Sequence, residues 1–207
     1  MTTLAPRLAS VRPLEGWTLT LVIAALLLAA SALAHFLAGG GTDGYRSVIR
    51  LTARTSLVLF LASFAASSLV RLAPSTTTRW LMRNRRHIGV SFAVSHLVHA
   101  AAILALVRAD AALFWQLTTV GSLVSGSSTY LIIALMAATS VDGSARRIGP
   151  RLWQSLHWWG AWYIWVSFVF TNGKRVPMSL WYLVPIALLG LVAALRLLAA
   201  RPRSRRG

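Results

Sequence analysis

Residues 88–107 read IGVSFAVSHLVHAAAILALV, an apolar stretch without a charged side chain. In an α-helix, a stretch of this length rises about 30 Å, which matches the hydrocarbon core of a bilayer. A strand of a folded domain rarely runs this far without a turn residue. The stretch therefore predicts a helix that crosses a membrane.

Five further segments have comparable length and apolar character. Together with the first, the predicted spans are 17–38, 48–70, 88–107, 113–138, 152–171 and 178–199. Each is expected to be helical, since the chain lacks the alternating ten-residue segments typical of membrane β-barrels. The predicted fold class is all-α integral membrane, a six-transmembrane-helix bundle over 17–199. A segment at 1–16 precedes this domain, and a basic tail at 200–207 follows it.

The composition agrees with a membrane protein and excludes several chemistries. Hydrophobic residues make up 57% of the chain, charged residues 12%, and mean hydropathy is +0.65. The acidic residues all lie between predicted spans, at Glu15, Asp43, Asp110 and Asp142. This placement argues against a proton pump, a carboxylate-based cation transporter, a di-iron bundle or a hydrolase with paired carboxylates. The absence of cysteine excludes disulfides, iron–sulfur clusters and thiolate chemistry.

The net charge of +17 is distributed unequally between the two sets of loops. Most arginines lie after the second span, after the fourth span and near the two chain ends. By the positive-inside rule, both termini are predicted to be cytoplasmic, in a multi-pass protein of the inner (plasma) membrane. The basic residues form no continuous basic helix, so we expect the lipid bilayer and no nucleic acid as a partner. Ala32-Leu33-Ala34 could also be a signal-peptidase site, which leaves cleavage of the first span open.

Three histidines inside predicted spans are the candidate functional residues. His96 and His99 are three apart, so they project from neighbouring positions on the third span, and His157 lies in the fifth. An imidazole in hydrocarbon needs a partner, and two imidazoles facing each other across a bundle can ligate the iron of heme b. The alternative is that these histidines only form hydrogen bonds across the bundle. Beside His157, Gly160 and Ala161 leave a bare strip where a porphyrin could lie.

Arg54, about one turn inside the second span, is a further candidate. A guanidinium at that depth needs a compensating anion or a route to the interface, and the predicted spans contain no acid. A heme propionate would satisfy it with a bidentate pair, and snorkelling is the alternative.

Four short motifs, in this order along the chain, resemble the ferric reductase-like transmembrane superfamily. Within it, the chain most closely resembles the heme-binding membrane subunits of bacterial methionine sulfoxide reductase systems. The similar segments are 52–57 (TARTSL), 85–89 (RRHIG) followed by His99, 139–140 (TS) with 146–149 (RRIG), and 153–157 (WQSLH). The resemblance implies heme b and electron transfer from a cytoplasmic flavin reductase, or from a quinol, to a periplasmic partner.

One departure from the family pattern puts the ligand pairs in doubt. The family usually has a second fifth-span histidine thirteen residues after the first, and that position is Phe170 here. His35, near the non-cytoplasmic end of the first span, could replace it. His157 could instead pair with His96 or His99, and the family register favours a cytoplasmic-side pair of His87 with His157. A five-coordinate heme on His99 or an empty outer site also remains possible.

The sequence thus predicts the electron-transfer subunit of an oxidoreductase rather than a complete enzyme. Heme b is the expected cofactor, with FMN or quinone as further candidates. The expected partners are a separate flavin reductase or quinol donor and an extracytoplasmic redox partner, for which the resemblance favours a sulfoxide reductase. Two alternatives stay open: a heme-free membrane anchor of a redox complex, and a transporter that uses the histidines as a proton relay.

Overall fold

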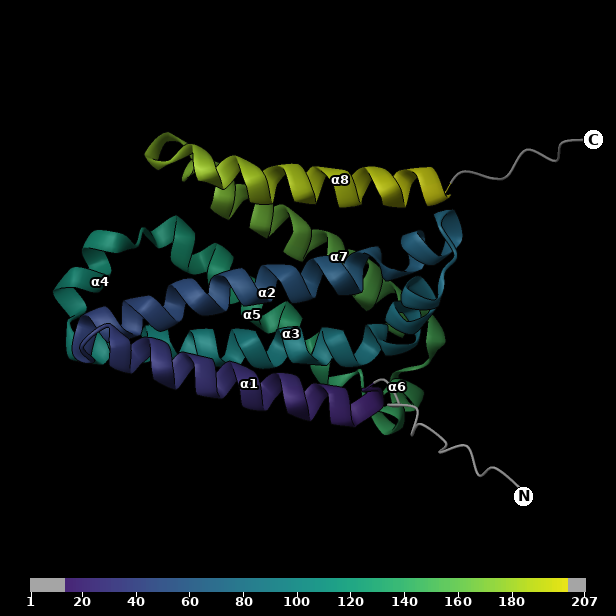
Figure 1. Cartoon of the computed structure of the whole chain (residues 1–207), viewed down its shortest axis with the longest axis horizontal. Coiled ribbons are helices and arrows are strands. Elements are labelled where there is room, and N and C mark those ends of the chain that lie inside the picture. The colour runs from purple at the N-terminus through teal and green to yellow at the C-terminus, as the bar shows by residue number, and fades with distance from the viewer. Residues whose placement is uncertain (1–13, 201–207) are drawn as a thin grey trace, which may run out of the picture.

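The computed structural model describes residues 14–200 of the chain. Every regular element among these residues is a helix, which confirms the all-α prediction (Figure 1). The α-helices are α1 (Gly16–Leu37), α2 (Gly41–Leu72), α3 (Thr76–Ala109), α4 (Ala111–Leu117), α5 (Val120–Ala138), α6 (Asp142–Ile148), α7 (Pro150–Gly173) and α8 (Leu183–Ala200). Two 3₁₀ turns, η1 (Val176–Met178) and η2 (Leu180–Tyr182), connect α7 to α8.

Five helical segments are long and apolar enough to cross a membrane. They are α1, α2, α3, α5 and the segment Leu180–Ala200, which contains α8. Helix α7 has 24 residues, but it carries five tryptophans together with polar side chains such as Gln154 and His157. These residues lower its hydropathy, so the sixth span remains a prediction.

The predicted span at 113–138 is divided into two helices in the structure. The Asp110 side chain accepts a hydrogen bond from the backbone N–H of Leu113 at 2.8 Å and begins α4. Thr118 is extended, and the Thr119 hydroxyl accepts from the backbone N–H of Ser122 at 3.2 Å. Such side-chain caps satisfy the N–H groups that a helix start leaves without partners. The two caps therefore separate the short helix α4 from α5.

The centre of the bundle is the antiparallel pair of α2 and α3. Small polar residues lie between these helices: the Ser56 hydroxyl donates to that of Ser95 at 2.8 Å, and both side chains are buried. Small residues let helix backbones approach closely in a membrane, and their hydroxyls hydrogen-bond across the contact. Helix α1 packs against both central helices, α8 packs against α2, and α5 packs against α7.

Both ends of the bundle can be followed in Figure 1. The first turn of α1, the last turn of α8 and the short helix α6 lie at one end, and α4 lies at the other. Helices α3 and α7 begin at the first end, while α2 and α5 finish there. We call this end, which carries the arginine-rich connections, the basic end.

Candidate functional site

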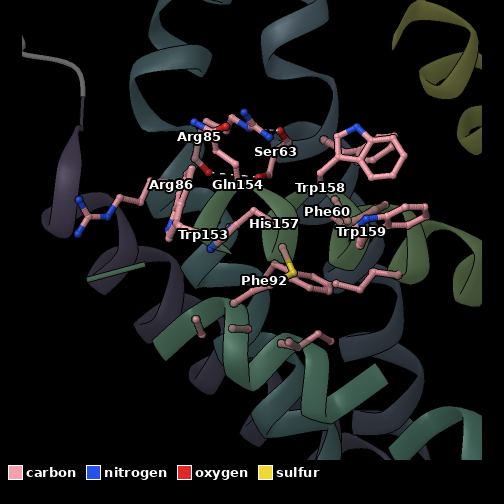
Figure 2. Close-up of a pocket in the computed structure, with 18 of the residues that line it drawn as sticks. Phe60, Ser63, Arg85, Arg86, Phe92, Trp153, Gln154, His157, Trp158 and Trp159 are labelled. Atoms are coloured by element: carbon pink, nitrogen blue, oxygen red, sulfur yellow. Dashed lines mark hydrogen bonds between the residues drawn. The ribbon is translucent and has the colours of Figure 1, made fainter. Parts of the chain in front are cut away.

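A cavity of about 710 Å³ opens in the half of the bundle nearest the basic end. Helices α2, α3, α5, α7 and α8 all contribute to its wall. Its apolar lining includes Phe60, Phe64, Phe92, Ile133, Ala161 and Ile164 (Figure 2). This volume lies within the range of small-molecule and cofactor sites, about 300–1,000 Å³.

Four arginines line the cavity, and no Asp or Glu is among its described lining residues. The arginines are Arg85, Arg86, Arg151 and Arg196. Two of the chain's acids form ion pairs elsewhere: Glu15 with Arg83 at 2.9 Å and Asp43 with Arg46 at 3.0 Å. Arg85 and Arg196 form no ion pair within the described part of the chain, so their side of the cavity favours an anionic ligand.

Neutral groups hold two of these guanidinium groups in place. Arg85 Nε donates to the carbonyl oxygen of Ser63 at 3.2 Å, and the Ser63 hydroxyl donates to the Arg85 carbonyl at the same distance. Arg196 Nη1 donates to the carbonyl oxygen of Phe64 at 3.0 Å, and its guanidinium lies 4.1 Å from the Phe64 ring centroid. Figure 2 shows Arg85 beside Ser63 at one side of the cavity.

None of these arginines was predicted as a site residue: Arg85 and Arg86 were recognised as part of a family motif, and Arg151 and Arg196 as topology signals. The available signal was Arg196, which lies inside the predicted span 178–199 without an acidic partner, as Arg54 does in its own span. The structure places Arg196 at the cavity and Arg54 on an exposed face of α2. Arg54 therefore lies outside the cavity lining, whereas Arg196 is part of it.

His157 is the only histidine among the described lining residues. Its ring stacks on Trp153, with centroids 4.3 Å apart, and its Nε2 forms a hydrogen bond with the Thr139 hydroxyl at 3.1 Å. The Trp153 indole N–H donates to the Thr139 carbonyl at 2.9 Å. The structure thus joins the 139–140 motif to the 153–157 motif, and the latter lines the cavity.

The two small residues beside His157, Gly160 and Ala161, have different surroundings in the structure. Ala161 lines the cavity, as expected for a strip that leaves room for a flat ligand. Gly160 instead faces α5, where a Cβ atom would lie 2.5 Å from Met136 Sδ and 3.0 Å from Ile132 Cγ2. The missing side chain of Gly160 therefore lets α5 and α7 approach each other.

His96 and His99 lie deeper in the bundle, outside the cavity lining. Their ring centroids are 5.9 Å apart, and the ring centroids of His96 and Phe92 are 4.7 Å apart. His99 Nδ1 forms a hydrogen bond with the Thr52 hydroxyl at 2.8 Å. The buried Nδ1 of His96 has no hydrogen-bond partner among the described residues. His99 is fourteen residues beyond Arg85 on α3, a rise of about 21 Å along the bundle.

The structure does not bring His87 to His157. The ring of His87 packs edge-on against Trp17 of α1, with centroids 5.2 Å apart, and His87 is not among the cavity lining. His87 and the lining residue Arg86 are adjacent on α3 and project in different directions, so the geometry gives the register-based pairing no support.

His35 and Phe170 also lie away from the cavity. His35 packs on Tyr45, with centroids 4.9 Å apart, and occupies the space that a side chain at Gly44 would need. Phe170 is 60% exposed, beside Lys174. The structure therefore assigns His35 a packing contact between α1 and the start of α2.

Sequence comparison relates the chain to a protein from Ralstonia nicotianae, the protein-methionine-sulfoxide reductase heme-binding subunit MsrQ. The two are 30% identical over 142 residues, which cover 65% of this chain and 64% of the relative. The resemblance stated from the four motifs is thereby confirmed, and the chain spans just under two thirds of the relative's length. No family model and no solved structure matches the chain.

Proposed function

We propose that this chain is a membrane subunit that binds heme b and relays electrons from a cytoplasmic donor to an extracytoplasmic acceptor. The observation that carries the proposal is the cavity at the basic end, where one imidazole and the guanidinium groups of Arg85 and Arg196 meet apolar aromatic walls. The similarity to a heme-binding subunit supports the same cofactor class.

The residues of the cavity fit a heme. A porphyrin is flat and apolar and carries two propionates at one edge, so it needs aromatic walls and cations on one side. Phe60, Phe92 and Ile164 supply apolar walls, and Arg85 and Arg196 would hold the propionates through charge-assisted hydrogen bonds. His157 would supply an axial imidazole. A chain without cysteine cannot attach heme covalently through thioethers, which supports the b type.

A second group of residues would serve the other half of the membrane. His99 is the proposed iron ligand there, and His96 lies beside it with a buried ring nitrogen that lacks a hydrogen-bond partner among the described residues. When bound, heme supplies one-electron redox chemistry, and the protein supplies axial ligation, orientation and a low dielectric. An exposed Phe170 contributes no imidazole to this group.

We further propose six membrane spans with both termini cytoplasmic, in the inner membrane. Helix α7 would be the sixth span, and its polar composition is explained by the cavity, which Trp153, Gln154 and His157 line. Polar side chains inside a bundle that face a cavity do not oppose insertion as lipid-facing ones do.

The proposed electron donor is a flavin reductase or a quinol, and the proposed acceptor is a sulfoxide reductase. The acceptor class follows from the relative's description as a subunit of a protein-methionine-sulfoxide reductase. For the donor, the cavity arginines could also hold the phosphate of FMN. A quinol could enter beside Trp158 and Trp159, which line the cavity and are 49% and 66% exposed.

A visible spectrum of the detergent-purified chain, oxidised and then reduced with dithionite, tests the proposal. We expect a Soret band that shifts on reduction, and loss of heme per protein in His157→Ala and His99→Ala. His87→Ala, which removes an imidazole outside the cavity lining, is the control and should retain heme. Full heme retention in both ligand variants would refute the ligand assignment.

The replacement of a family histidine by Phe170 favours one alternative, a heme-free anchor that assembles with another redox protein. A preparation that stays colourless after heme is supplied, yet folds and binds its partner, would support that alternative.

A further inference from the structure

Two threonines contact two of the candidate histidines in the same way. Thr52 of α2 bonds His99 of α3 through Nδ1, at 2.8 Å. Thr139, at the C-terminal end of α5, bonds His157 of α7 through Nε2, at 3.1 Å. Both threonines belong to motifs that the heme assignment leaves unexplained, and each bond joins two neighbouring helices of the bundle, α2 to α3 and α5 to α7. The two bonds use different ring nitrogens.

The hydroxyl group of Thr52 already donates its proton to a backbone carbonyl of its own helix. Thr52 Oγ1 lies 2.7 Å from the carbonyl oxygen of Val48, the preceding helical turn, and 3.2 Å from that of Ile49. Two oxygens 2.7 Å apart repel each other unless a proton lies between them, and a carbonyl cannot donate one. The hydroxyl therefore donates to Val48 and accepts from His99, so Nδ1 of His99 carries the proton. Thr52 is 0% exposed, so bulk water does not compete.

The hydroxyl group of Thr139 likewise donates its proton to a backbone carbonyl of α5. Its Oγ1 lies 2.7 Å from the carbonyl oxygen of Leu135, one turn earlier in α5. The hydroxyl therefore donates to Leu135 and accepts from His157, so Nε2 of His157 carries the proton. A neutral imidazole has one N–H and one lone pair, and the hydrogen bond to one nitrogen decides which nitrogen remains free for a metal.

We propose that Thr52 and Thr139 hold the two histidines in opposite tautomers, so that His99 is preset to bind iron through Nε2 while His157 is not. The lone pair of His99 is on Nε2. That of His157 is on Nδ1, and Nε2 of His157 can bind iron only after it releases Thr139. Thr52 is thus a positioning residue that supports its ligand, and Thr139 competes with the metal. This inference rests on the proposed heme function only for its consequence, not for the tautomers.

The first test needs no heme. Nitrogen-15 spectra of the full-length chain in detergent, labelled at the histidine ring nitrogens and recorded near pH 8, distinguish the protonated nitrogen in each ring. His99→Gln and His157→Gln identify the two sets of signals by their loss. We expect the Nδ1–H form for His99 and the Nε2–H form for His157. The same tautomer in both rings would overturn the proposal, whether or not the protein binds heme.

The second test compares isosteric variants in a heme titration of the apo chain. Thr52→Val removes the acceptor, and we expect heme affinity about 10- to 100-fold weaker, the usual effect of removing the partner of a metal-bound histidine. Thr52→Ser keeps a hydroxyl that can accept the same bond, so it should restore binding. Thr139→Val should bind heme at least as tightly as the unaltered chain, because it frees Nε2 of His157.

Either of two results would overturn the proposal: unchanged affinity in Thr52→Val, or weaker binding in Thr139→Val. If Thr52→Val does not fold, the nitrogen-15 spectra and the heme titration of Thr139→Val still test the proposal. A chain that binds no heme under any condition refutes the proposed function instead, and leaves the tautomers to be read from the first test.

Discussion

Replacing Arg196 by Gln tests whether the cavity holds the anionic edge of a heme. Arg196 donates to the Phe64 carbonyl at 3.0 Å and lies over the Phe64 ring, so its guanidinium is held at the cavity without an acidic partner. A propionate in the cavity would gain a hydrogen bond to a charged donor, worth about 1.5–3 kcal/mol. Since about 1.4 kcal/mol corresponds to a factor of ten, Arg196→Gln should weaken heme binding roughly 10- to 100-fold.

The matched control is Arg54→Gln, which removes the same charge from an exposed face of α2. Arg54 is the residue that sequence reasoning alone would pair with a propionate, so the two variants separate the two interpretations. Arg196→Lys keeps the charge but not the planar fork, and it should fall between Arg196→Gln and the unaltered chain.

The assay is a titration of the apo protein with heme, followed by Soret absorbance, with thermal stability measured for each variant. Loss of the bond to Phe64 also lowers stability, so binding is compared only among variants that remain folded at the assay temperature. Heme affinity in Arg196→Gln equal to that of the unaltered chain would refute the anion role of the cavity. An equal loss of heme affinity in Arg54→Gln and Arg196→Gln would show that the effect comes from the net charge of the chain and not from a contact in the cavity.

Two further predictions concern the packing that shapes the cavity. Gly160→Val should lower the thermal midpoint by roughly 2–10 °C, because a side chain there meets Met136 and overpacking costs about 1–3 kcal/mol. Gly126→Ala, at a helical position with open space beside it, should leave the midpoint unchanged or raise it, and an equal fall in both would contradict the argument. Trp153→Phe removes the indole bond to the Thr139 carbonyl but keeps a ring beside His157, so we expect a loss of about 1 kcal/mol of stability. A thermal scan that detects no fall in Trp153→Phe would show that the indole bond contributes nothing.

The sequence predicted the helical class because long apolar runs in a chain with few charges can form little else in a bilayer. It did not predict the division of 113–138, since the two caps depend on local backbone geometry at Asp110 and Thr119. Mean hydropathy does not detect such caps, because a single polar residue changes the mean over a long stretch of sequence very little.

The candidate site was predictable only in part. His157 was named from the sequence, and the structure places it in the cavity lining beside Trp153, a residue of the same motif. Arg196 was missed, because a basic residue near a helix end has two interpretations, a topology signal or a cavity wall, and sequence alone does not distinguish them. His87 was predicted from register along the axis, but register does not give the direction in which a side chain projects.

The sequence by itself therefore determined an all-helical apolar chain with a basic excess, imidazoles inside apolar helices and no intramembrane acid. These properties follow from residue identity and spacing along one helix. Only the tertiary structure decided that Arg85 and Arg196 meet at the cavity, that Gly160 serves a helix contact, and that Thr52 and Thr139 bond different nitrogens of two histidines. The physical reason is that each of these facts depends on how two helices are rotated toward each other, and that rotation is fixed by packing between segments far apart in the chain.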